Sequence, residues 1–251
     1  MKSTLRVLSS LLTAGILSAT LVAQTTGAGR YDQNIQSKAV QKLAEKTEFR
    51  NVHASVEDGI IDLTGSVDLY QQKLDATKRV RKIDKAQGVR NQIVVSSTAP
   101  DAQLAATLDR KIYFDRIGYD NTFNFVSVSV KDGVATLSGE TRNDVGRDSA
   151  LAIANTTPGV KEVVDDIKVL PVSGFDDQIR LRTARAVYGY SGLSKYGIDP
   201  ARPIRIVVDN GHVSLYGVVN SSMDKQIAGM RASQVFGVFS VQNNLVVANQ
   251  S

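Results

Sequence analysis

Three short segments of the chain alternate apolar and polar residues, and each segment runs into a turn sequence. Their apolar positions are Val52, Ala54 and Val56, then Val126, Val128 and Val130, then Ile204, Ile206 and Val208. A period of two predicts β-strands with one buried face. Asp-Gly or Asn-Gly follows each segment, at 58–59, 132–133 and 210–211, and such pairs favour tight hairpins because they tolerate positive φ.

The hairpins belong to a longer repeat. A second glycine stands six residues after the turn glycine in every copy, and 26 residues later comes Asn91, Asp165 or Asn243. Return strands are indicated by Ile61 and Leu63, by Ala135 and Leu137, and by Val213 and Leu215. Agreement over this length predicts three copies of one structural unit.

Apolar residues at helical spacing stand on both sides of each hairpin. The helices before the hairpins are indicated by Ile35, Ala39 and Leu43, by Leu104, Leu108 and Ile112, and by Ile179, Thr183 and Val187. Those after them are indicated by Ala76, Val80 and Ile83, by Ala150, Ala154 and Thr157, and by Ala228, Ala232 and Val235. Asp32, Asp101 or Asp176 opens each unit, and we expect its carboxylate to cap the first helix.

A last strand follows the second helix, through Ile93, Ile167 or Leu245. The helix makes a crossover, so this strand should pair in parallel. The elements predict an α+β fold of three tandem αββαβ domains, each a three-stranded mixed sheet with two helices on one face. We place the domains at residues 31–97, 101–170 and 176–248, and call them units 1, 2 and 3.

Residues 1–23 have the pattern of a signal peptide. Lys2 and Arg6 precede an apolar stretch from Leu8 to Val22, and Ala23 supplies a small residue for cleavage. The stretch is shorter than the roughly 20 residues that span a bilayer, and an uncleaved anchor is the alternative. The chain has no Cys, which excludes disulfides and the lipid-modified Cys of a bacterial lipoprotein. We expect a soluble periplasmic protein.

The repeat resembles the BON domain, named for bacterial osmotically inducible periplasmic protein Y and nodulation-associated proteins. The resemblance rests on GVATLSG at 133–139, GVKEV at 159–163 and GVFSVQNNLVV at 237–247, and it covers nearly all of the chain after the signal peptide. Unit 1 departs from the pattern, because Lys85 stands where units 2 and 3 have glycine. We therefore expect its second helix to run longer. A third copy is also a departure, since two copies are the common arrangement.

This resemblance implies a periplasmic or envelope binding module without catalysis. Some relatives bind anionic phospholipid at membrane surfaces. Others are linked to osmotic stress, to pore-forming partners or to transport. The family has no catalytic residue that could be carried over to this chain, and it implies no cofactor.

The two histidines do not indicate a metal or catalytic site. His53 faces away from the predicted core, His212 follows a hairpin glycine, and neither recurs in the other units. A metal site needs several converging ligands. No serine stands in a Gly-x-Ser-x-Gly turn. We therefore predict no enzyme, no catalytic residue and no metal.

The units differ most between the first helix and the first strand, where units 2 and 3 are longer and rich in aromatic residues. The residues are Tyr113, Phe114, Tyr119, Phe123 and Phe125 in unit 2, and Tyr188, Tyr190 and Tyr196 in unit 3. Amphipathic rings suit a membrane interface or a protein contact. Alternatively, they cover small cores or bridge neighbouring units.

Charge adds one candidate site. The whole chain carries +5, and unit 2 is acidic while its neighbours are basic. In unit 3 the candidate lipid-binding or partner-binding residues are Arg180, Arg182, Arg185, Tyr188, Tyr190, Arg202 and Arg205. A cation close to an anionic membrane contributes about 1 kcal/mol. We expect these residues to bind a membrane phospholipid surface. A solvated helix face is one alternative, and pairing of unit 2 with its basic neighbours is another.

A second hypothesis makes the protein an adaptor for an envelope protein or a cell-wall component, associated with transport or pore-forming partners. Nucleic acid is disfavoured by export and by the weak positive charge.

Overall fold

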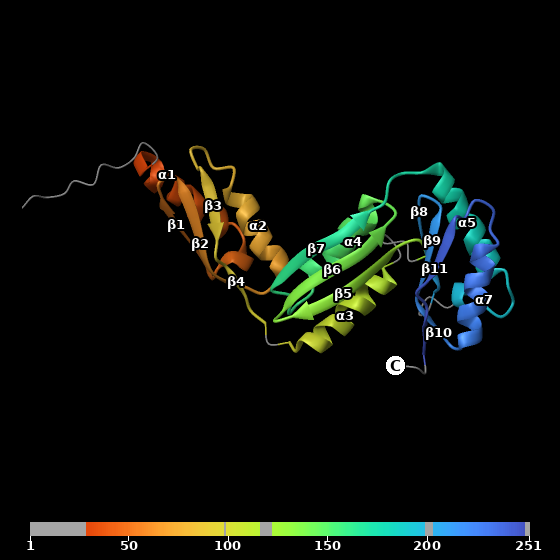
Figure 1. The fold of residues 1–251 in the computed structure, drawn as a ribbon. Coiled ribbons are helices and arrows are strands. Elements are labelled where there is room, and N and C mark those ends of the chain that lie inside the picture. The colour runs from red at the N-terminus through yellow and green to blue at the C-terminus, as the bar shows by residue number, and fades with distance from the viewer. Residues whose placement is uncertain (1–28, 98, 116–121, 199–202, 249–251) are drawn as a thin grey trace, which may run out of the picture.

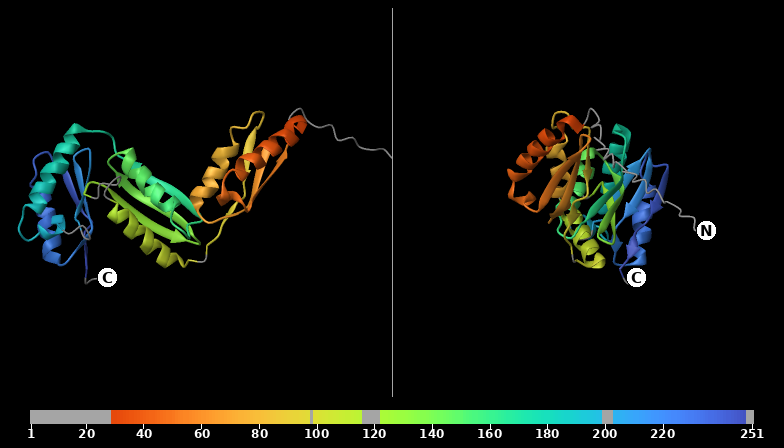
Figure 2. Two further views of the ribbon diagram at one scale, coloured as in Figure 1. Left: turned by 180° about the vertical axis from the view of Figure 1, so that it is seen from behind. Right: turned by 90° about the vertical axis from the view of Figure 1, so that its left-hand side faces the viewer.

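The structure is a computed structural model, and it describes residues 29–97, 99–115, 122–198 and 203–248. Three units, each a small sheet with its helices, follow one another in a row (Figures 1 and 2). The signal peptide predicted for residues 1–23 lies outside the described ranges. Within those ranges, no helix is both long enough and apolar enough to cross a membrane.

The units repeat one order of elements. Unit 1 contains α1 (Asp32–Ala44), β1 (Val52–Glu57), β2 (Ile60–Val67), α2 (Tyr70–Val80), β3 (Gly88–Asn91) and β4 (Val94–Val95). Unit 2 contains α3 (Asp101–Phe114), β5 (Phe125–Lys131), β6 (Val134–Thr141), α4 (Asp144–Asn155) and β7 (Glu162–Val169). Unit 3 contains α5 (Gly174–Tyr188), α6 (Lys195–Ile198), β8 (Arg205–Asp209), β9 (His212–Tyr216), β10 (Val218–Val219), α7 (Ser222–Ser233), β11 (Ser240–Asn243) and β12 (Val246–Val247).

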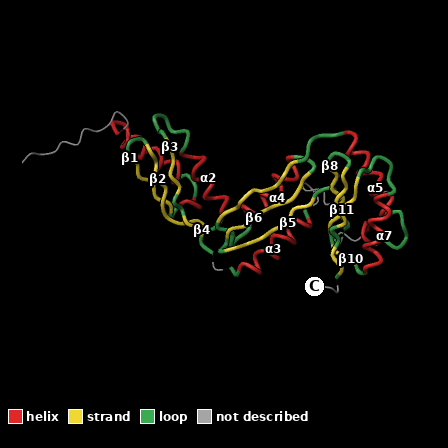
Figure 3. The backbone as a smooth tube through the Cα atoms, viewed as in Figure 1, coloured by secondary structure: helices red, strands yellow, loops and turns green. Residues whose placement is uncertain are grey.

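The middle strand of each sheet pairs antiparallel with the strand before it and parallel with the strand after the crossover helix. The sheet orders are β1-β2-β3, β5-β6-β7 and β8-β9-β11, and β4, β10 and β12 are short continuations. Both long helices of each unit lie on one face of its sheet (Figure 3). The predicted α+β fold with mixed three-stranded sheets is confirmed.

Each unit has its own core, made of residues at the predicted apolar positions. Fully buried members include Ile35, Ile61 and Leu63 in unit 1, Leu108 and Leu137 in unit 2, and Ile179, Ile206 and Leu215 in unit 3. The residues that alternate with them form the opposite, open face of each sheet. His53 lies on that face in unit 1 and is exposed, as predicted.

Both repeated glycines are required by the backbone. The hairpin pairs Asp58-Gly59, Asp132-Gly133 and Asn210-Gly211 all have positive φ, between 50° and 82°, which is the geometry of a two-residue turn that fits the twist of the strands. At the second glycine of unit 1, Gly65, φ is +109°, and an added Cβ would lie 1.9 Å from the Asn51 carbonyl oxygen. A side chain there would break the pairing of β1 with β2.

The aspartate that opens each unit holds the hairpin turn rather than capping its helix. The two carboxylate oxygens of Asp32 accept the backbone N–H groups of Asp58 and Gly59, at 2.9 and 2.8 Å. Asp101 and Asp176 make the same pair of bonds to the turns of units 2 and 3. The expectation of a helix cap is wrong, because the amides of the turn point at the carboxylate from a segment more than 25 residues away.

The repeated position on the last strand ties that strand to the second helix. Asn91 donates to the Lys73 carbonyl at 2.8 Å, and Asn243 donates to the Lys225 carbonyl at 2.7 Å. Unit 2 has Asp165 here, which cannot donate while ionised. It pairs instead with the guanidinium of Arg147, at the helix position equivalent to those lysines. The two units with Asn and the unit with Asp therefore make the same connection by different chemistry.

Lys85 does not lengthen the second helix of unit 1. Its φ is +67°, close to the left-handed conformation of Gly159 and Gly237 at the same place in units 2 and 3. The helix α2 has 11 residues, against 12 in α4 and α7. The expectation of a longer helix is wrong, because the lysine backbone adopts the conformation of the turn.

Units 1 and 2 meet at Tyr70, the first residue of α2, which packs against the cores of both units. Burial raises the pKa of the Tyr70 hydroxyl, and the charge of Glu162 in unit 2 adds to this, while a hydrogen bond with the backbone of Val163 opposes it.

Replacing Asp101 tests the link between the first helix and the hairpin. Asp101→Asn leaves one acceptor oxygen for two amides, so we expect unit 2 to lose about 1–3 kcal/mol of stability. Amide hydrogen exchange should become faster at Asp132 and Gly133. The turns of units 1 and 3 are internal controls. Unchanged exchange at both amides would show that the carboxylate does not hold the turn.

Candidate functional site

The open sheet face of unit 3 is covered by one end of unit 2. Both Ile206, on the core face of β8, and Val207, on the open face, are buried, which makes β8 a strand covered on both sides. The Ile206 N–H donates to the Thr122 carbonyl of unit 2 at 2.8 Å. The Phe125 ring, at the start of β5, stacks on Tyr216 with centroids 4.0 Å apart and an interplanar angle of 1°.

Arg205 is part of this junction. Its side chain projects from the open face of β8, only 4 % exposed, and its guanidinium lies 4.4 Å from the centre of the Tyr113 ring and 5.9 Å from that of Phe125. Cation–π contacts of this kind gain strength where water is excluded. Arg205 thus binds the neighbouring unit.

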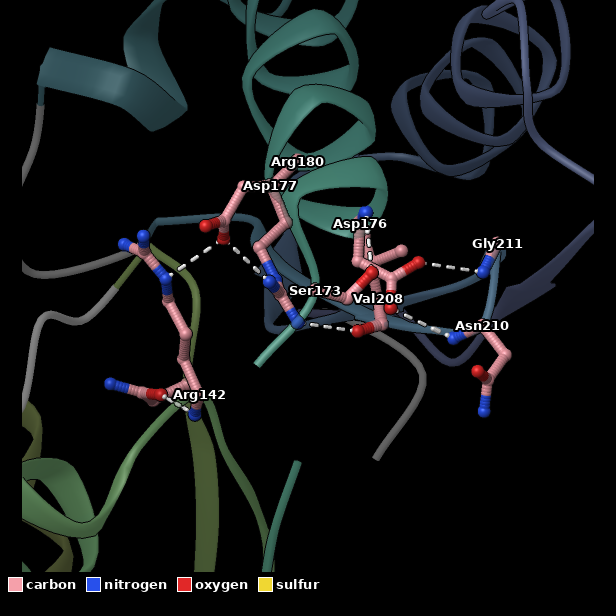
Figure 4. Close-up of polar contacts among 9 residues, drawn as sticks. Arg142, Ser173, Asp176, Asp177, Arg180, Val208, Asn210 and Gly211 are labelled. Carbon is pink, nitrogen blue, oxygen red and sulfur yellow. Dashed lines mark hydrogen bonds and ion pairs between the residues drawn. The ribbon is translucent and has the colours of Figure 1, made fainter. Parts of the chain in front are cut away.

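Arg180 is buried as well, with 2 % of its surface exposed. It donates to the Val208 carbonyl at 2.6 Å and to the Asp177 carboxylate at 2.8 Å. Arg142 of unit 2 approaches the same carboxylate at 3.0 Å (Figure 4). One carboxylate of unit 3 therefore lies between an arginine of its own unit and one of unit 2.

These placements correct the expectation for two of the candidate residues. Because Arg180 and Arg205 are buried and bonded within the protein, neither guanidinium is available to a membrane surface in this structure. A basic run in a sequence does not distinguish the two situations, since arginine stems bury readily when the head group finds acceptors.

The ion pairs across the junction also reverse the expected signs. Unit 2 is acidic overall, yet it contributes the cations: Arg142 pairs with Asp177, and Lys168 lies 2.6 Å from Asp209. The hydrogen bond with Asp209 raises the pKa of Lys168, against the opposing effect of burial. The pairing of units 2 and 3 is present, but it depends on individual residues and not on net charge.

The candidate tyrosines of unit 3 pack against its core. Tyr188 is partly buried, and its hydroxyl donates to the Ile204 carbonyl. Burial raises the pKa of this hydroxyl, and the nearby Tyr113 adds to the effect while Arg205 opposes it. Tyr190 is partly buried too, and the Arg231 guanidinium lies 5.0 Å from its ring centre.

Two other aromatic residues of these segments, Tyr196 and Phe123, also pack in the core of unit 3 or against it. Tyr196 is buried, and its hydroxyl donates to Asp224 at 2.5 Å. Phe123 of unit 2 packs against the core of unit 3. The alternative that these rings cover cores or bridge units describes them. Phe114 is 46 % exposed, and Tyr119 lies outside the described residues.

Two of the candidate cations do face solvent. Arg182 and Arg185 are exposed on α5, three residues apart and therefore on one side of the helix. Arg182 contacts the Gln178 side chain at 3.1 Å and the Phe236 carbonyl at 3.5 Å. Arg202 lies outside the described residues.

Unit 3 also has three exposed phenylalanines that were not among the predicted site residues. Phe175, Phe236 and Phe239 are 48 %, 85 % and 70 % exposed. The rings of Phe175 and Phe239 have centroids 6.1 Å apart, and Gly237 lies against Phe175. We call these three residues the phenylalanine cluster. The sequence GVFSVQN suggests that Phe239 is a core residue. The one sequence signal against this is that units 1 and 2 have no phenylalanine at the equivalent position.

No group of His, Asp and Glu side chains able to hold a metal ion occurs in the described ranges.

A crevice of about 560 Å³ lies between units 2 and 3 and is lined mostly by apolar residues, with Asp109 and Arg205 as its charged ones. His212 is exposed, and its ring contacts the Ser240 hydroxyl and the edge of Phe239. These contacts give no reason to assign a catalytic role to His212 or Ser240.

The Asp177 carboxylate makes the junction sensitive to acid. Burial would raise its pKa, but the hydrogen bonds from Arg180 and Arg142 outweigh this and hold the pKa below the ordinary 3.8. A lowered folded-state pKa stabilises the native protein above the ordinary carboxyl range, and this stabilisation is lost as pH falls through the folded value. We expect the unfolding temperature of unit 3 to decrease when the pH drops below about 4.

Asp177→Asn should lower that temperature at neutral pH and flatten its dependence on acid. Thermal unfolding followed from neutral pH to about pH 3 measures both effects. Asp148→Asn, at an exposed carboxylate of α4, is the matched control. Equal pH profiles for the wild type and Asp177→Asn would contradict the role of this carboxylate.

Comparison with solved structures yields only weak likeness. CdsD, a structural protein of the type III secretion system of Chlamydia trachomatis, has a TM-score of 0.26 at 12 % identity, over 85 % of this chain and 92 % of that one. A structure of its C-terminal domain gives 0.24 at 12 % identity, over 84 % and 96 %. The PrgH periplasmic domain gives 0.21 at 9 % identity, over 83 % and 98 %. Scores this low support no argument about this chain.

No curated protein matches this chain. The family comparison, in contrast, covers most of it. The BON domain model matches residues 31–97, 100–171 and 190–249, which are three separate matches along the chain. The third match begins after α5, so Arg182 and Arg185 lie outside it. With its three αββαβ units, the chain belongs to the BON domain family.

Proposed function

We propose that this protein is a non-catalytic binding module of the cell envelope, exported to the periplasm, and that unit 3 binds anionic phospholipid surfaces. Family membership supports this role, since BON domains are generally non-catalytic and are associated with binding at the membrane or envelope. The signal-peptide pattern of residues 1–23 supports export.

The observation that carries the proposal is that Arg182 and Arg185 are exposed on one side of α5, and that Arg182 reaches the phenylalanine cluster at the Phe236 carbonyl. Two exposed guanidinium groups attract lipid phosphates, and the exposed phenylalanine rings of the same unit favour the interfacial region of a bilayer. The nearest carboxylates on α5 do not cancel this attraction: Asp176 is bound to the hairpin turn, and Asp177 is bound to Arg142 and Arg180.

The site is therefore smaller than the sequence suggested. Arg205 binds unit 2, Arg180 is buried and bonded within unit 3, and Tyr188 and Tyr190 support the core of unit 3. Arg182 and Arg185 remain as the candidates for contact with phosphate.

Co-sedimentation with phosphatidylglycerol–phosphatidylcholine vesicles tests the proposal. The wild type should bind these vesicles, weakly bind phosphatidylcholine alone, and bind less in high salt. Arg182→Ala with Arg185→Ala should weaken binding roughly 10- to 30-fold, at about 1 kcal/mol for each cation.

The matched control is Lys38→Ala with Lys42→Ala, which removes the same charge from exposed positions of α1, the equivalent helix of unit 1. Equal binding by both double variants would contradict the site in unit 3. Recovery of one stoichiometric protein partner by crosslinking, with no vesicle binding, would favour an adaptor instead.

A further inference from the structure

The repeated fold does not require phenylalanine side chains at the positions of Phe236 and Phe239. In unit 3 the Phe239 N–H donates to the Gly211 carbonyl, and in units 1 and 2 Gln87 and Lys161 donate to the equivalent turn glycines. The three backbones are thus matched at this position while the side chains differ. Only unit 3 carries an aromatic ring there.

The same comparison applies to Phe236. It stands just before Gly237, and the residues in that place in units 2 and 1 are Pro158 and Asp84. A residue 85 % exposed packs against very little of its own unit. An apolar ring presented to solvent in this way indicates a surface that another apolar phase covers.

The backbone that carries Phe236 and Phe239 is held by hydrogen bonds. Backbone bonds run from Val238 to the Val235 carbonyl and from Phe239 to Gly211. The Gly211 turn is itself fixed by the two bonds to Asp176. The Phe239 ring lies over Gly211, within 3 Å of where a Cβ would be. Little ordering is therefore needed for the rings to enter an apolar phase.

The charge near the rings indicates which apolar phase they enter. The Phe236 carbonyl accepts a hydrogen bond from Arg182 at 3.5 Å, so a guanidinium lies beside the backbone of the residue that carries the most exposed ring. A basic group beside apolar rings matches the boundary of an anionic bilayer, where phosphates lie directly above the acyl chains. A phenylalanine also lacks the polar atom that would hold it at the level of the headgroups.

We propose that Phe236 and Phe239 insert into the acyl region of the bilayer while Arg182 contacts phosphates above them. This inference rests on the proposed function and deepens it, since it sets the depth and the orientation of unit 3 on the membrane. Insertion of the rings also adds a hydrophobic contribution to membrane binding, which salt does not screen as it screens the charge of the arginines.

The absence of tryptophan from the chain allows a direct test. Phe239→Trp creates a single fluorescent reporter in the cluster, and Lys161→Trp places the same reporter at the matched position of unit 2. On phosphatidylglycerol vesicles, the Phe239→Trp emission should shift to shorter wavelength and be quenched by lipids brominated along their acyl chains. The Lys161→Trp emission should do neither.

The outcomes separate this inference from the proposed function. Vesicle binding without acyl-chain quenching of Phe239→Trp overturns insertion and leaves phospholipid binding intact. Failure of the wild type to bind vesicles overturns both.

A loss variant gives a second test. Phe236→Gln with Phe239→Gln uses the side chain that unit 1 carries at the second position, so the fold should be kept, as circular dichroism can verify. This variant should lose the binding that the wild type retains in high salt, and keep most of its binding in low salt. Retention of the high-salt binding would contradict insertion.

Discussion

The stacked rings of Phe125 and Tyr216 lie in the junction that closes the open sheet face of unit 3. Each unit buries one face of its sheet under two helices and leaves the other face open. In unit 3 that open face is closed by the end of unit 2, with Arg205 over Tyr113 and with ion pairs at Asp177 and Asp209. The cationic side chains that bond in this junction are not available to a ligand. The surface that remains for binding is the outer side of α5 and the turn after α7.

Within each unit, the repeated residues maintain the shape. A carboxylate on the first helix holds both amides of a left-handed turn, a second glycine lets two backbones approach, and an Asn or an Arg–Asp pair ties the last strand to the second helix. These contacts recur in all three units and so cannot account for what distinguishes one unit from another. The binding properties we propose lie in residues that only unit 3 carries, such as Phe236 and Phe239.

Periodicity predicted the strands, the hairpins, the parallel crossover and the core, because these follow from local spacing. The partner of Asp101 was not predictable in this way: an aspartate at a helix start looks the same whether it binds the helix or a turn 31 residues away. The burial of Arg205 was missed because it involves the rings of Tyr113 and Phe125 in unit 2, whose position no local pattern encodes. The burial of Arg180 was missed because its acceptor at Val208 is 28 residues away. Phe239 was missed for the opposite reason, since its motif suggests a covered residue and its exposure depends on tertiary structure.

Unit 2 closes the open sheet face of unit 3, and a distance measurement across this junction is the most direct test of that packing. The chain has no Cys, so Ser129→Cys and Gln226→Cys, at exposed positions of β5 and α7, allow a spin label on each unit. Pulsed electron spin resonance on the full chain should give one narrow distance distribution. A broad distribution would show that the two units move independently, and that Arg205 is not held against Tyr113 and Phe125 of unit 2.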